Sequence, residues 1–525
     1  MDRRLLLRLA FAAATGSLPV RWARSAASLR ADPFACGVAS GAPDDRSVVL
    51  WTRVANVSLP SPDATAAVRW EIADDVQFRR IVRAGVAAAV PALGHAVHVE
   101  AGGLAADRWY FYRFHLGDAT SPVGRTRTFP APDVMAARLR FAFASCQRWE
   151  HGYYAAWRHV ADEHPDLVVF LGDYIYEYAS PRKPDPSIVR SHTLHYATTL
   201  ADYRDRYALY KSDPDLQRAH RACPWIATWD DHEVQNDYAG DVGQAETPGA
   251  FLMQRSAAYQ AFYENMPLRT SALVRGLAGL GQPDGVRVHS RYAFGRLAQF
   301  HLLDTRQYRD VQACRDMRKS SSGAVRADAC AALSDPTRTL LGTGQEQWLD
   351  AGLQADAAGG RTRWSVIAQQ TLFSSRNYGA DGGPVPTDGW DGYPAGRDRL
   401  LASLQRNQPA NTVFIGGDIH QNFVCDVHAD VAHATGPRVA TEFCGTSITS
   451  LSGASQERLD ALVRRNLHIH LAISEKRGYG WVEVTPARWD TTLRVVDDAR
   501  QADSDITNLA RFRVDDGIPG ATPIS

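Results

Sequence analysis

The chain lacks a net charge. Its 525 residues include 58 Lys and Arg against 58 Asp and Glu, and no charge-rich tail is present. A protein that captures nucleic acid or an anionic membrane by long-range attraction normally carries a basic excess. The composition therefore predicts no nucleic-acid-specific binding surface. Substrate capture must rely on local charge, for which bound metal ions are the obvious source.

The chain also lacks a transmembrane segment. The apolar stretch Leu9–Val20 is too short to span a bilayer as a helix. It follows the adjacent Arg3 and Arg4 and precedes small residues that offer a cleavage site. This order predicts a twin-arginine signal peptide over residues 1–27, use of the twin-arginine export machinery, and a periplasmic or secreted protein. The alternatives are an ordinary Sec signal and an uncleaved amphipathic tail.

Cysteine is scarce, with seven residues, and the odd number leaves at least one thiol unpaired. Cys314 and Cys330 flank a polar insertion and form one candidate disulfide, which would contribute about 3 kcal/mol on the chain-entropy model. Cys425 and Cys444 lie on successive strand-like runs and form a second candidate pair. If Cys146 is a metal ligand, six cysteines remain, and their pairing is open.

The length predicts two domains, and the pattern changes along the chain accordingly. Residues 30–132 are rich in strands and turns, which predicts a small all-β domain of immunoglobulin or fibronectin type. Its expected strands are 47–53, 67–72, 109–114 and 125–129. Over residues 138–510 strands alternate with helical patterns, the signature of an α/β domain. Its expected strands are 139–145, 167–171, 226–229, 298–303, 364–369 and 413–415, with helices at 152–163, at 345–355 and from 397.

Five short polar clusters each follow an apolar run. They are Ser145-Cys146-Gln147, Gly172 to Glu177, Trp229 to Glu233, Leu303 to Arg306 and Gly416 to His420. In a layered α/β fold, the ends of the strands are where a sheet presents its chemistry. Four of the clusters supply oxygen, sulfur or imidazole ligands, so together they predict a multinuclear metal site for phosphate ester hydrolysis.

Asp173 and Tyr176 have the spacing Gly-Asp-x-x-Tyr, which is similar to that of purple acid phosphatases. A carboxylate at the end of a strand can bridge two cations. A tyrosine ligand must lose its proton, and its ordinary pKa of about 10 means that a strong Lewis acid such as Fe³⁺ is needed. The alternative is a turn with a capping aspartate.

Asp418 and His420 follow a clean strand and are two residues apart. In an extended segment such residues point to the same side, so both can face one group of metals. Oxygen-rich sites suit Ca²⁺ or Mg²⁺, whereas Tyr, Cys and His suit iron. Zinc would explain a phenolate ligand poorly.

The order and the residues of the five clusters resemble the motifs of the PhoD-like alkaline phosphatase family, a branch of the metallophosphoesterase superfamily. The resemblance implies a four-layer α/β sandwich and a site with one Fe³⁺ and Ca²⁺ ions nearby. The implied metal ligands are Cys146, Asp173, Tyr176, Asp231, Asn236, Asp418 and His420. For Cys146, which ends its strand, the alternative is a small buried side chain.

The resemblance also implies a catalytic role for His232, which would protonate or hydrogen-bond the leaving oxygen. The alternative for its segment is the start of a surface helix with an aspartate as N-cap. Arg306 is a candidate for binding the substrate phosphate through two hydrogen bonds. A buried structural pair between Asp304 and Arg306 is the other interpretation, and the sequence favours it.

These features predict a secreted, metal-dependent alkaline phosphatase and phosphodiesterase. It would cleave phosphate mono- and diesters by attack of metal-activated water or oxide, for phosphate acquisition. One alternative is a phospholipase D-like phosphodiesterase that acts on lipid head groups, but no basic amphipathic helix supports it. A non-catalytic exported binding protein is another, although binding alone would need neither Cys146 with Tyr176 nor His232.

Overall fold

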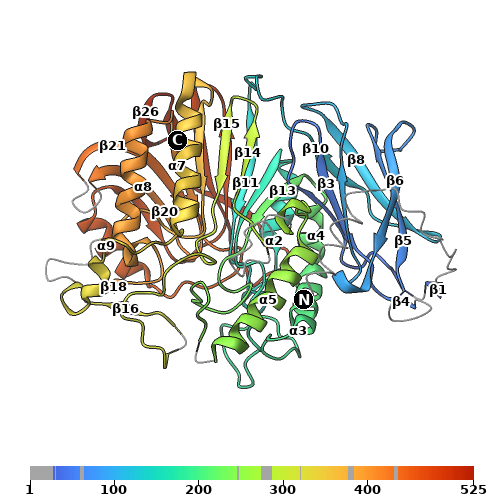
Figure 1. Cartoon of the computed structure of the whole chain (residues 1–525), viewed down its shortest axis with the longest axis horizontal. Helices are drawn as coiled ribbons and strands as arrows, with labels where there is room; N and C mark the ends of the chain where they lie inside the picture. The colour runs from blue at the N-terminus through green and yellow to red at the C-terminus, as the bar shows by residue number, and fades with distance from the viewer. Residues whose placement is uncertain are drawn as a thin grey trace.

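The computed structural model describes residues 28–29, 31–58, 64–244, 247–273, 286–319, 321–376, 383–430 and 435–525. The predicted export signal at residues 1–27 lies outside the described residues. No helix within these ranges is long and apolar enough to cross a membrane. The described chain has two large β-sheets with helices around them, which is a mixed α/β fold of the predicted class (Figure 1).

The first large sheet, sheet I, has ten strands in the order β26-β25-β24-β23-β11-β12-β13-β2-β3-β7. Their bounds are β2 Val38–Gly41, β3 Val48–Arg53, β7 Ala96–Ala101, β11 Leu139–Ala144, β12 Leu167–Leu171, β13 Pro224–Thr228, β23 Arg477–Val484, β24 Arg488–Val496, β25 Ile506–Asp515 and β26 Ile518–Pro523. Strands β11, β12 and β13 run parallel, and β12 and β13 are buried along their whole length. Continuous apolar runs of this kind are typical of parallel strands that are covered on both faces.

The second large sheet, sheet II, has seven strands in the order β14-β15-β17-β19-β21-β20-β22. Their bounds are β14 Ser290–Phe294, β15 Ala298–Leu302, β17 Trp364–Ala368, β19 Val413–Gly416, β20 Asn422–Asp430, β21 Thr435–Cys444 and β22 Ile469–Ile473. Strands β15, β17, β19 and β21 are parallel. The six strands predicted for the α/β region are therefore confirmed, with small shifts at their ends.

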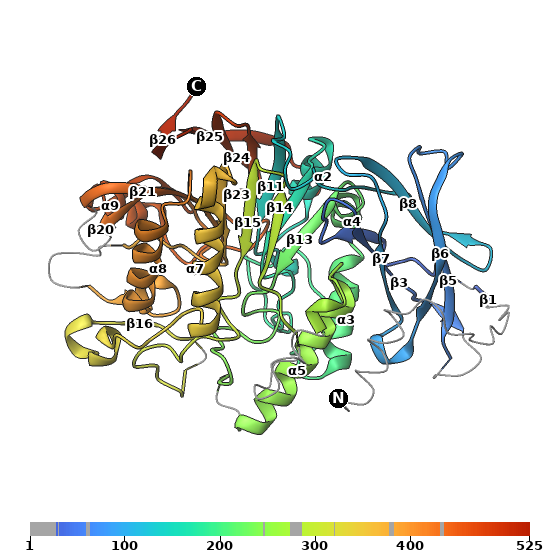
Figure 2. The same ribbon diagram turned by 45° about the horizontal axis from the view of Figure 1, so that its top comes forward.

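Helices cover the outer face of each sheet, and the two inner faces pack on each other (Figure 2). The helices are α2 Ala155–Asp162, α3 Leu200–Lys211, α4 Pro214–His220, α5 Pro248–Asn265, α7 Thr343–Ala357, α8 Pro394–Asn407 and α9 Gln456–Arg465. One hydrophobic core lies between sheet I and the helices α2, α3, α4 and α5. A second lies between sheet I and sheet II, and a third lies between sheet II and the helices α7 and α8. The three predicted helices are present as α2, α7 and α8.

The N-terminal region contributes a smaller sheet in the order β10-β8-β5-β6, with β9 beside β8. Its strands are β5 Ala66–Ala73, β6 Ile81–Ala89, β8 Trp109–Leu116, β9 Ala119–Thr120 and β10 Gly124–Arg127. It packs on β2, β3 and β7, and β2 pairs with β13. The predicted strands are present, but the second layer of this region is the end of sheet I rather than a separate sheet. Backbone pairing between distant strands leaves no local mark in the sequence, so the shared layer could not be expected.

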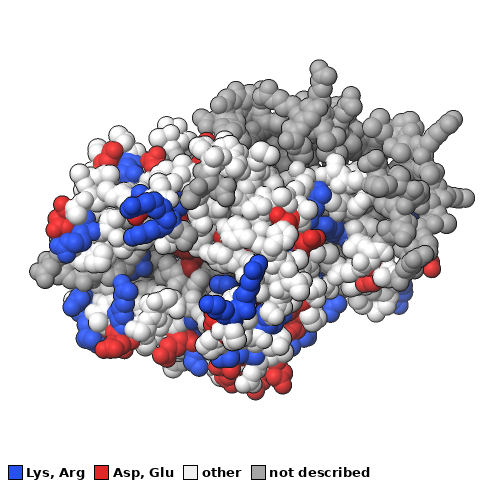
Figure 3. All heavy atoms as spheres, turned by 90° about the horizontal axis from the view of Figure 1, so that it is seen from below, with Lys and Arg blue, Asp and Glu red and all other residues white. Residues whose placement is uncertain are grey.

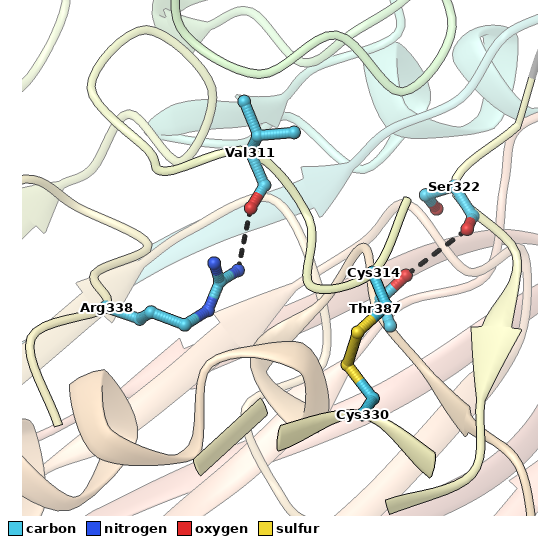
Figure 4. Close-up of a disulfide and its surroundings, with 6 residues drawn as sticks. All are labelled: Val311, Cys314, Ser322, Cys330, Arg338 and Thr387. Atoms are coloured by element: carbon cyan, nitrogen blue, oxygen red, sulfur yellow. Dashed lines mark hydrogen bonds between the residues drawn. A yellow bond between two sulfur atoms is a disulfide. The ribbon is translucent and has the colours of Figure 1, made fainter. Parts of the chain in front are cut away.

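The disulfide between Cys314 and Cys330 is confirmed (Figure 4). It closes the insertion that carries β16 (Ala324–Val325), which pairs with β18 (Val385–Pro386). The second predicted pair is wrong, because Cys425 and Cys444 are both free and buried. They lie on adjacent strands, but Cys425 faces Glu442 across the pair, so Cys444 is its diagonal neighbour. Diagonal residues lie about 7–8 Å apart, beyond the usual span of a disulfide.

The predicted ligands lie where parallel strands of both sheets end. Cys146, Asp173, Asp418 and His420 follow β11, β12 and β19, and each adopts a positive φ, between 56° and 64°. Non-glycine residues take this left-handed conformation at some cost in free energy. Such strain is tolerated where the surrounding structure fixes the direction of a side chain. Here the strained residues lie together at one edge that the two sheets share.

Candidate metal centre

A group of four side chains with sulfur, oxygen and nitrogen atoms meets at this edge; we call it the mixed-ligand cluster. Ligand atoms of Cys146, Asp173 and His420 lie within 4.8 Å of one another. The Tyr176 hydroxyl donates to Asp173 Oδ2 at 2.8 Å and lies 3.2 Å from His420 Nε2. The structure thus brings together Cys146, Tyr176 and His420, which the resemblance suggests for iron, and Asp173, which it suggests as the bridging carboxylate.

Neighbouring groups hold the mixed-ligand cluster in place. Ser450 Oγ lies 2.7 Å from the Tyr176 hydroxyl and 2.9 Å from the carbonyl oxygen of Cys146. His420 Nδ1 lies 2.9 Å from the carbonyl oxygen of Leu451. Since a carbonyl only accepts, Nδ1 carries the proton, and Nε2 presents its lone pair to the cluster. This is the tautomer that a metal ligand needs.

A second group consists of carboxylates alone; we call it the carboxylate cluster. Oxygen atoms of Asp230, Asp231 and Asp418 lie within 4.8 Å of one another. Asp230 and Asp231 follow β13 in sheet I, whereas Asp418 follows β19 in sheet II. The two clusters are contiguous, because Asp173 and Asp231 also form a group with His232 at the same mutual distance.

Arg306 lies at the carboxylate cluster and is only 1% exposed. Its Nε donates to Asp230, and its Nη1 lies 2.8 Å from Asp388 Oδ2. Its Nη2 lies 3.6 Å from Asp231 Oδ1 and 3.7 Å from Asp418 Oδ1. The Arg306 guanidinium therefore contacts four aspartates, none of which is Asp304. Asp304 instead accepts the backbone N–H groups of residues 306 and 307.

His232 lies at the junction of the two clusters. Its Nδ1 lies 2.7 Å from Glu177 Oε2, and its ring stacks on Tyr176 with the centroids 4.1 Å apart. The same glutamate accepts the backbone N–H of Asn236 at 2.9 Å and the Tyr196 hydroxyl at 3.3 Å. Glu177 thus fixes both His232 and the loop that carries Asn236.

Glu233 makes the reciprocal connection. It is fully buried and accepts the backbone N–H groups of Asp173, Tyr174 and Asp230 at 3.1, 2.5 and 2.8 Å. Glu177 belongs to the loop after β12 and accepts hydrogen bonds from the loop after β13. Glu233 belongs to the loop after β13 and accepts hydrogen bonds from the loop after β12. Two buried carboxylates therefore lock these loops together.

Five acidic residues of the site were not singled out from the sequence: Glu177, Asp230, Glu233, Asp237 and Asp388. The first three lie inside the polar clusters, so their position beside the predicted ligands was the available signal. Asp237 follows Asn236 and makes a contact within its own loop, whereas Asp388 makes a contact with a distant segment. Asp237 donates its backbone N–H to Asp231 Oδ2 at 2.6 Å, and Asp388 binds Arg306. The spacing of residues in the sequence gives no indication of the contact between Asp388 and Arg306.

Burial controls the protonation of the mixed-ligand cluster. It raises the pKa of the Cys146 thiol and of the Tyr176 phenol well above their usual values, and the charge of Asp173 adds to both shifts. Without a cation, these two groups keep their protons at neutral pH. A bound cation would have to displace them.

The acidic groups around Arg306 shift in different directions. Burial raises the pKa of Asp418 to about 6, and Asp388 contributes to the rise although Arg306 opposes it. Burial disfavours the charge on His232, yet Glu177 and the nearby aspartates raise the pKa of its ring well above 6.5. The ring is therefore a protonated acid at neutral pH in this arrangement.

The side chains fit a site for cations. Asp173 Oδ1, Asp230 Oδ2 and Asp231 Oδ1 are buried, and none of them has a hydrogen-bond partner among the described residues. A buried carboxylate oxygen without a partner is costly. Asp173 Oδ1 and Asp230 Oδ2, together with Asp231 Oδ1, which Arg306 Nη2 approaches only to 3.6 Å, lie beside a thiol, a phenol and an imidazole, and metal ions would satisfy them best. The donor set supports both a mixed-ligand ion and an oxygen-bound ion.

Known proteins share this architecture. The sequence profile of the PhoD-like phosphatase family matches residues 141–493, and that of its N-terminal domain matches residues 21–130. Alkaline phosphatase D of Bacillus subtilis (strain 168) is 42% identical over 516 residues, which span 97% of this chain and 85% of that protein. A solved structure of PhoD aligns with a TM-score of 0.86 at 41% identity, over 94% of this chain and 93% of that one.

Proposed function

This chain belongs to the PhoD-like phosphatase family, and on that premise we propose that it is a metal-dependent alkaline phosphatase that cleaves phosphate mono- and diesters. The observation that carries the proposal is the position of Asp173, whose carboxylate lies in both the group with Cys146 and His420 and the group with Asp231 and His232. A carboxylate shared in this way can bridge two cations around one phosphate.

We assign Fe³⁺ to the mixed-ligand cluster and Ca²⁺ to the carboxylate cluster together with Asn236. The thiol, phenol and imidazole support iron, and an all-oxygen set supports calcium. When bound, such ions supply Lewis acidity that neutralises charge on the phosphate and activates water for attack. The described residues then have to orient the ester and handle the proton of the leaving group.

His232 is suited to the proton transfer. Its Nδ1 is committed to Glu177, which leaves Nε2 to donate a proton to the leaving oxygen. The Glu177 carboxylate raises the pKa of the ring, which favours its protonated form. Arg306 is better suited to balancing the charge of the aspartates than to binding phosphate, because Nε and Nη1 already bind Asp230 and Asp388.

Replacement of His232 by Ala tests the acid role. We expect kcat on a nitrophenyl phosphodiester to fall by about 10²–10⁴-fold, the usual contribution of general acid–base catalysis. The matched control is His195→Ala, since the side chain of His195 is 80% exposed. A His232→Ala protein that retains activity within about tenfold of the original would refute the role.

The visible absorption spectrum of the purified protein tests the iron assignment. We expect a broad charge-transfer band that decreases when Tyr176 is replaced by Phe, because the phenolate is one of its donors. Asp231→Asn should leave the band in place. A colourless protein, free of iron by elemental analysis and still active, would rule out Fe³⁺ and leave the phosphatase assignment standing.

We also propose export through the twin-arginine route to the periplasm or the exterior, where the enzyme would release phosphate for uptake. The segment 1–27 motivates this proposal, and the Cys314–Cys330 disulfide supports it, since disulfides persist in oxidising compartments. Mass spectrometry of the mature N-terminus in the producing cell tests it. Replacement of Arg3 and Arg4 by Lys should retain the precursor in the cytoplasm, and unchanged export would exclude the twin-arginine route.

A further inference from the structure

Arg148 is a cation beside the metal centre, and the roles described above do not use it. It follows Cys146 by two residues, in the loop after β11. Its backbone N–H donates to Ser450 Oγ at 3.1 Å, and the same Oγ lies 2.7 Å from the Tyr176 hydroxyl. One serine hydroxyl therefore connects the backbone of Arg148 to the mixed-ligand cluster.

The side chain of Arg148 lies against two aromatic rings. Its Cζ atom is 5.1 Å from the ring centroid of Tyr178 and 5.9 Å from that of Tyr176. His232 contacts the same two rings, because it stacks on Tyr176 at 4.1 Å and lies edge-on to Tyr178 at 5.2 Å. Arg148 is therefore close to the ring that, in the proposed function, protonates the leaving oxygen. A group attached to that oxygen lies within reach of Arg148.

The protein uses only one side of the Arg148 guanidinium. Nε lies 3.4 Å from Oε2 of the buried Glu150, and no oxygen of the described residues accepts from Nη1 or Nη2. Asp185 also interacts electrostatically with Arg148, but it is exposed and forms no ion pair with it. The Arg148 side chain is 19% exposed. The edge formed by Nη1 and Nη2 is therefore available to a solute.

Other arginines near the mixed-ligand cluster are occupied by the protein itself. Arg477 donates from Nη1 to the carbonyl oxygen of His420 at 2.9 Å and from Nη2 to that of Ser474 at 2.6 Å. Arg206 donates to two carbonyl oxygens of the loop after β12. The face of the molecule in Figure 3 has Lys and Arg side chains on both sides of a hollow in which acidic atoms are visible. An arginine in such surroundings binds a solute only where its N–H groups are unoccupied, and Arg148 meets that condition.

We propose that Arg148, with Tyr178 beside it, is a leaving-group subsite that selects phosphoesters whose leaving alcohol carries a carboxylate. The inference rests on the proposed function and deepens it, because it names a class of substrate. Nη1 and Nη2 match the two oxygens of a carboxylate, which arginine binds through parallel hydrogen bonds. Because Glu150 already offsets part of the charge of Arg148, a group with one negative charge suits the subsite better than a phosphate dianion.

The test compares the phosphate monoesters of β-hydroxypropionate and of propanol, which differ in a carboxylate in place of a methyl group. In the original protein, we expect KM for the carboxylate ester to be lower by about five- to tenfold, as for a charge-assisted hydrogen bond at a partly exposed site. Arg148→Ala should bring the two KM values together. Arg182→Ala is the matched control, because Arg182 is an exposed arginine of the loop that carries Tyr178, and it should keep the preference.

Three results would overturn the subsite. The first is equal KM values for the two esters in the original protein, and the second is a preference that survives in Arg148→Ala. The third is an equal loss with both esters in Arg148→Ala together with a loss of bound metal in elemental analysis. That result would indicate that Arg148 supports the mixed-ligand cluster through Tyr176 instead of binding the leaving group.

Failure of the proposed function would look different. If the original protein hydrolyses neither ester, calorimetry on the protein as purified measures the binding of γ-phosphonobutyrate and of butylphosphonate. In these compounds a methylene group replaces the ester oxygen, so no hydrolysis is needed. Tighter binding of γ-phosphonobutyrate that disappears in Arg148→Ala would support the subsite on its own. Equal binding of the two compounds, or no binding of either, would refute it.

Discussion

The two clusters at the metal centre control their charge in opposite ways. In the mixed-ligand cluster, the burial of Cys146 and Tyr176 keeps both groups protonated, and no arginine among the described residues forms an ion pair with its ligand atoms. In the carboxylate cluster, a buried arginine contacts the aspartates directly. The first cluster must release protons when a cation binds, whereas the second already contains a permanent positive charge.

This difference has a consequence for the two ions. Proton release makes cation binding to the mixed-ligand cluster depend strongly on pH, and it favours an ion that acidifies its ligands. Arg306 lowers the attraction of the carboxylate cluster for cations, so an ion there should exchange more readily. The comparison predicts one tightly held ion and one that a chelator removes first.

The largest effect should come from Asp173, which belongs to the group with Cys146 and His420 and also to the group with Asp231 and His232. Asp173→Asn removes the bridging charge, and we expect activity on nitrophenyl phosphate to fall to the detection limit while both ions are lost. Elemental analysis and the visible spectrum measure the two ions separately. If Asp173→Asn kept either ion in full together with half of the original activity, the two clusters would be independent.

The next largest effect should come from Arg306→Gln, which leaves the aspartates without their internal cation. Removal of one partner of a buried ion pair costs about 3–5 kcal/mol, and we expect a loss of this size in the free energy of unfolding of the chelated protein. Added Ca²⁺ should restore part of the stability, because a cation replaces the lost charge. Arg363→Gln, which breaks the surface pair with Asp516, is the control and should cost about 1 kcal/mol or less.

Removal of the Cys314–Cys330 disulfide should affect the carboxylate cluster more than the mixed-ligand cluster. Ser322, within the loop closed by Cys314 and Cys330, donates its N–H to Asp237 Oδ2 at 2.6 Å, and Asp237 donates to Asp231. Replacement of both cysteines by Ser should lower the free energy of unfolding by about 3 kcal/mol. We expect weaker Ca²⁺ binding and an unchanged visible band, because this loop contacts the carboxylate cluster. A changed band with normal Ca²⁺ affinity would contradict that connection.

The sequence was informative where a local pattern determines the structure. Apolar runs that end in Cys146, Asp173 or Asp418 predicted both the strands and the edge where the ligands meet, because parallel strands place their ends together. Contacts between distant segments have no such pattern. The partners of Arg306 come from loops after β13, β18 and β19, so the sequence suggested Asp304, its near neighbour, instead. The Cys425–Cys444 pair failed for the same reason, since strand register decides it.

The smallest effect should come from Glu177, which holds both His232 and the loop that carries Asn236. Glu177→Gln preserves the size of the side chain but removes its charge and one acceptor oxygen. The amide can no longer accept from both His232 Nδ1 and the Asn236 N–H. Partners that orient ligands and catalytic groups typically contribute about 10–100-fold, so we expect kcat to fall by about that factor while the visible band persists.

Tyr196→Phe is the matched control for this substitution. It removes the longest of the three contacts to Glu177, at 3.3 Å, and leaves His232 and Asn236 held. We expect less than about a threefold change in kcat from this variant, because the two contacts through which Glu177 orients His232 and Asn236 stay in place. If Tyr196→Phe lowered kcat as much as Glu177→Gln, general packing around the glutamate would explain the loss. If only Glu177→Gln does so, the orientation of His232 and Asn236 by one buried charge is what connects the two clusters to the ester.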